Sequence, residues 1–173
     1  MTWFKLLQPD VVLGESVLAL TPELIQQFGL QGIVLDVDET LVSFKESDTT
    51  NEVRAWLTSL KPLVSIWLVS NNLNHARIQR IAEPLDVPYI TGAGKPSRRK
   101  LRRATNAMNL PIHRVAMVGD RLFTDVLAGN RLGMFTVLVE PMVNPATGAS
   151  QYPLRSFEVM ASQLLGISLK KLS

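Results

Sequence analysis

The sequence predicts a three-layer α/β domain built on a mainly parallel sheet of five strands. Short apolar segments of strand length alternate along the chain with segments of helical periodicity, a pattern typical of strand–helix–strand units. The apolar segments are continuous, as in strands that a parallel sheet buries on both faces. With 173 residues, 46% of them hydrophobic, we expect one domain. It comprises an N-terminal extension with a short helix (1–30), a core (31–141) and a C-terminal loop and helix (142–173).

The first half of the chain has clear signals for where elements begin and end. Thr21 and Pro22 are typical of a helix start, and Gly29 of a helix end. This helix leads into the first strand, Gly32–Leu35. The pattern Thr49-Thr50-Asn51-Glu52 resembles a capping box and predicts a second helix. Its apolar side chains share one face: Val53, Trp56, Leu57 and Leu60. We expect Trp56 to lie in the core.

Strands and helices continue to alternate in the second half. The elements expected there are a strand over Ser65–Val69, a helix from about Asn74 to Glu83, a short strand near Tyr89, a helix with Leu101, Ala104 and Met108 on one face, a strand over Val115–Val118, a helix through Val126 and Leu127 that ends at Gly133, a strand over Phe135–Val139, and a final helix near Phe157–Leu165. Five strands separated in this way indicate parallel neighbours.

The charge of the chain is concentrated in one segment. The net charge is only +3, but no Asp or Glu occurs between Val87 and Gly119. The basic residues there are Lys95, Arg98, Arg99, Lys100, Arg102, Arg103 and Arg114. This pattern suggests an anionic partner, such as a phosphate ester, an acidic membrane or nucleic acid. The alternative is a solvated helix face.

Composition also bears on the compartment. The chain has no cysteine, which excludes disulfides and thiolate metal sites and fits a reducing compartment. Pro9 and Asp10 interrupt the apolar N-terminus, so we do not expect a signal peptide. No run of about 18 apolar residues occurs. We expect a cytoplasmic protein that can lie peripherally at the inner face of a membrane.

Two acids follow directly after the first strand. Asp36 and Asp38 would stand at its carboxyl end, the edge where ligands bind in open α/β sheets. On an extended backbone, residues two apart point the same way, so both carboxylates can converge on one small volume. Two like charges that close need a cation or a shared proton, and a hard divalent metal suits carboxylates. The alternative is that Asp36 begins a turn and Asp38 caps a helix, with Thr40 as a second capping candidate.

Polar residues also end the second and fourth strands. Ser70 is followed by Asn71 and Asn72, and Gly119-Asp120 is followed by Asp125. If these strands are neighbours of the first, their polar ends line one crevice with Lys95 nearby. The structural alternatives are that Ser70 simply ends a strand, that Lys95 is a solvated loop cation, and that Asp120 caps a helix. We expect His75 to be a surface helix residue.

Taken in order, Asp36-Val37-Asp38-Glu39-Thr40, Ser70, Lys95 and Gly119-Asp120 with Asp125 resemble the four motifs of the haloacid dehalogenase (HAD) superfamily of phosphatases, which have a Rossmann-like fold. The resemblance implies that Asp36 attacks phosphorus to form an aspartyl phosphate, and that Asp38 acts as acid and then as base. It implies that Thr40, Ser70, Asn71 and Lys95 bind the phosphoryl group, and that Thr40, Ser70 and Lys95 assist catalysis. It also implies Mg²⁺ held by the Asp36 carboxylate, the Asp38 backbone carbonyl and Asp120, with support from Asp125.

Further segments are similar to the capless YqeG family of HAD subfamily IIIA, which is related to mitochondrial phosphatidylglycerophosphate phosphatase. They are Leu-Leu-Gln-Pro-Asp at the start, Asp-Glu-Thr-Leu-Val, Val-Ser-Asn-Asn, Ala-Glu-Pro-Leu, Gly-Lys-Pro and Val-Gly-Asp-Arg-Leu-Phe-Thr-Asp. The similarity extends to about Pro141. Glu39 and Arg121 stand where Asn and Gln are more usual, and we expect these departures to affect specificity rather than the reaction.

The spacing of the motifs leaves no room for a cap domain. About 30 residues separate Thr40 from Ser70, and about 23 separate Asn72 from Lys95. An open site suits a bulky phosphate ester, and the resemblance favours phosphatidylglycerophosphate, a lipid of phospholipid biosynthesis. The basic segment would then face an anionic bilayer, and Trp3, Phe4, Leu6 and Leu7 would enter the interface or pack on the domain. The alternatives are a phosphatase of a soluble metabolite or phosphoprotein, and a non-catalytic module that binds nucleic acid through Lys95–Arg103.

Overall fold

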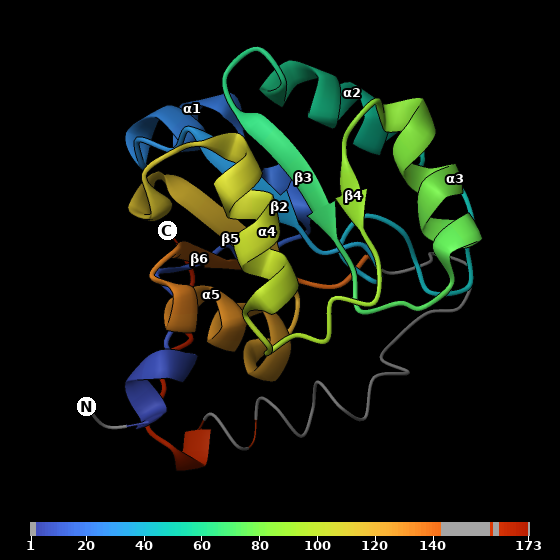
Figure 1. Cartoon of the computed structure of the whole chain (residues 1–173). Coiled ribbons are helices and arrows are strands. Elements are labelled where there is room, and N and C mark those ends of the chain that lie inside the picture. Colours follow the sequence, from blue (N-terminus) through green and yellow to red (C-terminus); the bar gives the residue numbers. More distant parts are fainter. Residues whose placement is uncertain (1–2, 143–159, 161–162, 173) are drawn as a thin grey trace.

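A parallel sheet of six strands forms the centre of the structure, a computed structural model that describes residues 3–142, 160 and 163–172 (Figure 1). The strand order is β1-β6-β5-β2-β3-β4, and every pair is parallel. The strands are β1 (Val11–Val12), β2 (Gly32–Leu35), β3 (Ser65–Val69), β4 (Tyr89–Ile90), β5 (Val115–Gly119) and β6 (Phe135–Leu138). The predicted parallel α/β architecture is confirmed.

The strand that the sequence did not predict is β1. It has only two residues and pairs with β6, Val11 opposite Val137. The Asp10 carboxylate anchors it by accepting hydrogen bonds from the Thr136 amide (2.8 Å) and hydroxyl (3.0 Å). Two residues are too few to show a hydrophobic period, so this strand depends on a partner more than 120 residues away.

The helices lie close to where the sequence predicts them, except that the helix expected through Val126 and Leu127 is π-helical up to Val126 and α-helical only from Leu127. They are α1 (Pro22–Gln27), α2 (Asn51–Leu60), α3 (His75–Leu85), α4 (Arg99–Met108) and α5 (Leu127–Leu132), with short 3₁₀ turns η1 (Trp3–Leu7), η2 (Val17–Ala19) and η3 (Ile112–Arg114) and a π-helical turn η4 (Leu122–Val126). The cap of α2 is Thr50, one residue after the position the capping-box pattern implies, because its hydroxyl accepts from the Val53 amide. The helix expected near 157–165 falls mainly outside the described residues.

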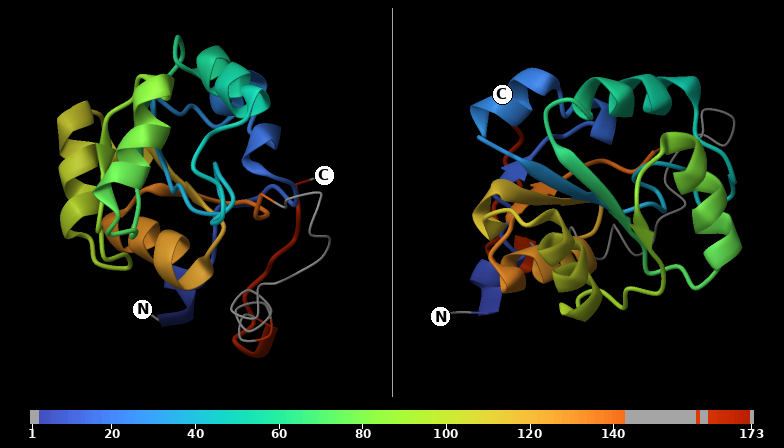
Figure 2. Two further views of the ribbon diagram at one scale, coloured as in Figure 1. Left: turned by 90° about the vertical axis from the view of Figure 1, so that its right-hand side faces the viewer. Right: turned by 45° about the horizontal axis from the view of Figure 1, so that its top comes forward.

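The helices cover both faces of the sheet and make three layers. Successive residues of β2 point to opposite faces, so Ile33 and Leu35 pack in a core cluster with α1, α2 and α3. Val34 packs in a second cluster with Leu101 of α4 and residues of α5. Figure 1 shows α4 and α5 in front of the sheet, and the turned views of Figure 2 show the sheet between its helices. Trp56 is buried as predicted, and its indole N–H donates to the Leu20 carbonyl at 2.9 Å.

The carboxyl ends of three neighbouring strands meet at one edge. Leu35 of β2 lies opposite both Leu68 of β3 and Val118 of β5, so the residues that follow these strands share the same edge. The connection from β2 to β3 contains only α2, and the connection from β3 to β5 contains α3, β4, α4 and η3. No cap domain is inserted there, and the edge stays open. Among the described residues, no helix has both the length and the apolar character needed to cross a bilayer.

Candidate active site

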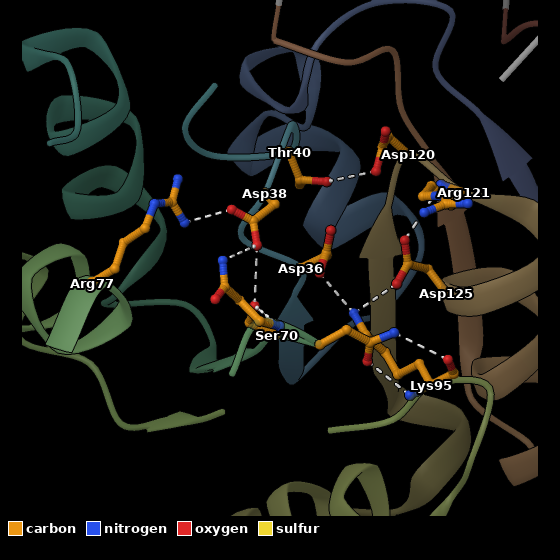
Figure 3. Close-up of polar contacts among 11 residues, drawn as sticks. Asp36, Asp38, Thr40, Ser70, Arg77, Lys95, Asp120, Arg121 and Asp125 are labelled. Carbon is orange, nitrogen blue, oxygen red and sulfur yellow. Dashed lines mark hydrogen bonds and ion pairs between the residues drawn. The ribbon is translucent and has the colours of Figure 1, made fainter. Parts of the chain in front are cut away.

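Asp36 begins the site at the end of β2. Its amide still donates to the Val118 carbonyl (2.9 Å), so its backbone is held in the sheet while its buried side chain points beyond the edge. The chain then turns sharply, because the Val37 carbonyl accepts from the amides of Thr40, Leu41 and Val42. Glu39 adopts a left-handed conformation with φ of 64° within this turn. The turn sends the side chains of Asp36 and Asp38 in different directions (Figure 3).

Lys95 lies between two carboxylates. Its Nζ is 2.7 Å from Asp36 Oδ1 and 2.7 Å from Asp125 Oδ1, and only 1% of its side chain is exposed. The alternative interpretation of Lys95 as a solvated loop cation is therefore wrong. Asn71 fixes the loop that delivers this lysine, since its carboxamide accepts from the Lys95 amide (2.7 Å) and donates to the Lys95 carbonyl (3.0 Å).

Burial and charge together shift the pKa values of this group. Burial raises the pKa of Asp36 to about 7, and Asp125 and Asp38 add to the rise while Lys95 opposes it. Burial by itself would lower the pKa of Lys95, but the carboxylates of Asp125 and Asp36 raise that pKa above its ordinary value. Lys95 thus remains a cation, and the charge of Asp36 depends on it.

Asp125 reaches the site from the π-helical turn after β5. Its other oxygen, Oδ2, accepts from the Arg121 amide (3.3 Å), so both carboxylate oxygens have donors. The side chain can approach the sheet because residue 119 is glycine: a Cβ at that position would lie 2.7 Å from Asp125 Cβ. π-Helical turns are rare and frequently occur at functional sites. Here the turn directs Asp125 back toward the end of β5.

Three acids form a cluster suited to a divalent cation. Asp36, Asp120 and Asp125 are buried, and each offers a carboxylate oxygen within 4.8 Å of the others. Lys95 supplies one positive charge against these three carboxylates. Buried, convergent carboxylate oxygens with an excess of negative charge fit a hard cation such as Mg²⁺. Thr40, which is fully buried, donates to Asp120 Oδ1 at 3.5 Å and orients that member of the cluster.

The Asp38 carboxylate is not part of this cluster, so the expected convergence of both acids of the first motif holds only in part. Its Oδ2 accepts from the Ser70 hydroxyl and the Asn72 carboxamide, both at 3.3 Å. Its Oδ1 forms an ion pair with Arg77 of α3. The physical reason is the turn at Val37, which ends the extended backbone on which the expectation rested.

Arg77 is a site residue that the sequence analysis missed. Nothing in its local sequence marks it, and it lies 39 residues from Asp38. One signal was available: the first turn of a helix that follows a strand lies at the same edge as that strand's carboxyl end. His75, in the same turn, is an exposed helix residue as expected, and its Nε2 lies 3.3 Å from the Tyr89 hydroxyl.

These groups line one open cleft of about 440 Å³. Its polar wall is built from residues of three motifs and from Asn71, the residue after Ser70: Asp36, Asp38, Asn71, Lys95, Asp120 and Asp125. Glu39 and Arg121 also line it, as do two exposed apolar residues, Phe44 (65% exposed) and Leu73 (87% exposed). The cleft therefore has a buried acidic floor and an apolar rim.

Comparison with known proteins agrees with this geometry. The HAD-hydrolase-like family model matches residues 92–162. Probable phosphatase YqeG of Bacillus subtilis strain 168 is 35% identical over 141 residues, which cover 81% of each chain. Dihydroxyacetone phosphatase of Corynebacterium glutamicum strain R is 35% identical over 75 residues, 43% of this chain and 26% of that protein.

Two solved structures share the fold. An uncharacterized protein from Listeria monocytogenes serotype 4b matches with a TM-score of 0.54 at 15% identity, over 79% of this chain and 99% of that one. A HAD-like protein from Mesorhizobium loti matches with a TM-score of 0.51 at 19% identity, over 82% and 90%. The matched family model and the 35% identity to the Bacillus phosphatase over 81% of each chain define a phosphatase of the HAD class. Within that class, the similarity to the Bacillus protein over four fifths of both chains shows that this chain belongs to the YqeG family.

Proposed function

We propose that this HAD phosphatase is a Mg²⁺-dependent phosphomonoester hydrolase that acts through an aspartyl phosphate at Asp36, with phosphatidylglycerophosphate as its favoured substrate. The observation that carries the proposal is the meeting of Asp36, Asp38 and Lys95 with two further carboxylates at an open sheet edge. A phosphate monoester repels a carboxylate nucleophile, so the site must offset negative charge and hold the attacking group in line.

The residues proposed to hold Mg²⁺ are Asp36 and Asp120 through their carboxylates and Asp38 through its backbone carbonyl. Asp125 accepts hydrogen bonds on both oxygens, from Lys95 and the Arg121 amide, which supports a role in holding the site together. A bound Mg²⁺ would supply positive charge to the phosphoryl oxygens and orient the ester. Lys95 adds a second, permanent positive charge beside the nucleophile.

In the proposed reaction, Asp36 forms a bond to phosphorus as the ester P–O bond breaks, and Asp38 gives a proton to the leaving oxygen. Asp38 then takes a proton from the attacking water, whose oxygen bonds to phosphorus as the bond between phosphorus and the Asp36 oxygen breaks. This step releases inorganic phosphate and restores the Asp36 carboxylate. We propose that Thr40, Ser70, Asn71 and Lys95 contact the phosphoryl group. The Thr40 and Ser70 hydroxyls now donate to carboxylates, so a phosphoryl oxygen would replace Asp120 and Asp38 as their acceptor.

The rim of the cleft supports a lipid substrate. The Leu73 and Lys100 side chains both lie close to Gly92. A Cβ added to Gly92 would be 3.0 Å from Leu73 Cδ2 and 3.5 Å from Lys100 Nζ, so these two side chains are neighbours. Exposed arginines continue from there along α4: Arg98, Arg99, Arg102 and Arg103. Exposed apolar side chains next to cations are what a protein needs to rest on an anionic bilayer, each cation near the surface contributing roughly 1 kcal/mol. Trp3 is also exposed, at 69%.

The competing candidate is a phosphatase of a soluble ester. The Corynebacterium relative is named dihydroxyacetone phosphatase, but the match covers only 26% of that protein. Binding of nucleic acid to the basic helix is a further alternative, for which a strongly salt-dependent duplex affinity would be expected.

The test measures phosphate release from phosphatidylglycerophosphate vesicles and from a panel of soluble phosphate esters, with Mg²⁺ or with EDTA. Asp36→Asn is the inactive variant. Asp86→Asn, at a fully solvated carboxylate (99% exposed), is its matched control. Metal-dependent release from vesicles that Asp36→Asn abolishes and Asp86→Asn retains would support the proposal. Release from a soluble ester alone would keep the chemistry and reject the lipid, and release in EDTA would reject the metal.

A second comparison tests the rim itself. Leu73→Ser is expected to slow hydrolysis in vesicles several-fold, whereas Leu63→Ser, at a second exposed leucine that does not line the cleft, should have no effect. Equal rates for both variants in vesicles would contradict a membrane-facing rim.

A further inference from the structure

Arg77 connects the predicted acid of the site to a distant loop. Its Nη1 donates to Asp38 Oδ1 in an ion pair. Its Nη2 donates to two backbone carbonyls of the loop after β2, Glu46 O at 2.9 Å and Ser43 O at 3.3 Å. Only 13% of the arginine side chain is exposed. The planar guanidinium thus joins α3, the first motif and the loop over 43–46.

The Asp38 carboxylate is held from two sides. Arg77 binds one oxygen, while the Ser70 hydroxyl and the Asn72 carboxamide donate to the other. Figure 3 shows Asp38 pointing toward Arg77, away from the group formed by Lys95 and Asp125. The ring of Phe44 lies 6.0 Å from Arg77 Cζ, on the rim of the cleft. The carboxylate is therefore held at the side of the cleft where Phe44 lies.

We infer that Arg77 is a positioning residue that holds the Asp38 side chain in place, so that this side chain, once protonated, can give its proton to the leaving oxygen. This inference rests on the proposed role of Asp38 as the acid. Proton transfer requires heavy-atom distances of about 2.6–3.2 Å, so a carboxylate free to rotate would be in place only part of the time. Three donors from two further elements remove that freedom. Arg77 also fixes the loop that carries Phe44, so Asp38 and this part of the rim keep fixed positions relative to each other.

The same helix provides a matched control. Arg80, three residues further along α3, pairs with Asp48 at 3.4 Å, with 66% and 61% of the two side chains exposed. Replacing Arg80 removes an arginine and a surface ion pair from the same element without touching the cleft. Any effect of charge on the protein as a whole should therefore be similar in Arg77→Gln and Arg80→Gln.

The experiment compares kcat/KM for two esters, p-nitrophenyl phosphate and glycerol phosphate. Nitrophenolate leaves without protonation, whereas the glycerol alkoxide needs an acid. For Arg77→Gln we expect a loss of about 10- to 100-fold on glycerol phosphate and less than about threefold on p-nitrophenyl phosphate. Arg77→Lys should lose nearly as much, because one ammonium cannot reproduce the planar fork. Arg80→Gln should leave both values unchanged.

The ratio of the two kcat/KM values does not depend on the fraction of folded enzyme, so it can be interpreted even when a variant is partly unfolded. Equal losses on both esters for Arg77→Gln, or no loss on either, would overturn the inference. Asp38→Asn tests the role of Asp38 separately from that of Arg77. If Asp38→Asn shows the selective loss and Arg77→Gln does not, only the role of Arg77 fails. If Asp38→Asn shows no selective loss, the proposed acid is wrong and the inference falls with it.

Discussion

Replacing Lys95 by methionine should destabilise the protein severely in the absence of metal. The lysine Nζ makes two ion pairs of 2.7 Å, and the exposed fractions of the three side chains are 1% for Lys95, 11% for Asp36 and 2% for Asp125. Methionine fills a similar volume but leaves two buried carboxylates without their cation. Breaking a buried ion pair from one side typically costs about 3–5 kcal/mol. For a protein of this size, that lowers the melting temperature by about 6–20 °C.

The stability lost in Lys95→Met should grow as the pH rises. Burial already raises the pKa of Asp36 from 3.8 to about 7 in the wild type, and removing Lys95 takes away the charge that opposes this rise. A carboxyl that holds its proton more tightly when folded than when unfolded destabilises the fold progressively as the pH rises above the unfolded pKa. The variant should therefore be closer to wild type at pH 5 than at pH 8.

The assay is urea unfolding followed by tryptophan fluorescence, in EDTA, at both pH values. Lys100→Met is the matched control, because the Lys100 ammonium donates to the Thr91 carbonyl at 2.8 Å and has no carboxylate partner among the residues that the structure describes. Its loss should cost about 1 kcal/mol. If Lys95→Met lowers the free energy of unfolding by less than about 1 kcal/mol at pH 8, or if this loss shrinks with rising pH, the buried ion pairs do not stabilise the fold as described.

Two further predictions concern the acidic cluster. Gly119→Ala should displace Asp125, because the new Cβ would lie 2.7 Å from the Asp125 Cβ. We therefore expect the affinity for Mg²⁺, measured by calorimetry, to fall about 10- to 100-fold. An unchanged affinity would mean that Asp125 does not support the metal site. In the wild type, that affinity should rise about tenfold from pH 6 to pH 8, since burial raises the pKa of Asp36 to about 7 and its proton competes with the metal below that value. A flat profile would show that Asp36 is not a ligand.

The elements of the fold are largely readable from the sequence. Gly32–Leu35 and Val115–Gly119 are continuous apolar runs, and burial on both sheet faces is what such runs require. The cap of α1 is Thr21, as the Thr-Pro pair indicates. Local patterns are weaker where two residues compete: Thr49 and Thr50 both offer a hydroxyl, and only the helix geometry selects Thr50.

The site is readable only in part. Its acids, Ser70 and Lys95 follow strands, and the parallel sheet brings those strand ends together. Arg77 has only the weaker signal of its place in the first turn of a helix that follows a strand, because its long side chain reaches Asp38 from that helix. The strand β1 is hidden for a similar reason, since its pairing with β6 depends on residues remote in the sequence.

The sequence by itself determined the alternation of strands and helices, the absence of room for a cap, and the chemical groups that reach the open edge, because hydrophobic period, spacing and residue type are local properties of the chain. The tertiary structure alone decided how those groups pair. Lys95 is 59 residues from Asp36 and 30 from Asp125, and Arg77 is 39 from Asp38. Such pairs form only when the packed sheet brings remote side chains within hydrogen-bonding distance and excludes the water that would otherwise solvate them.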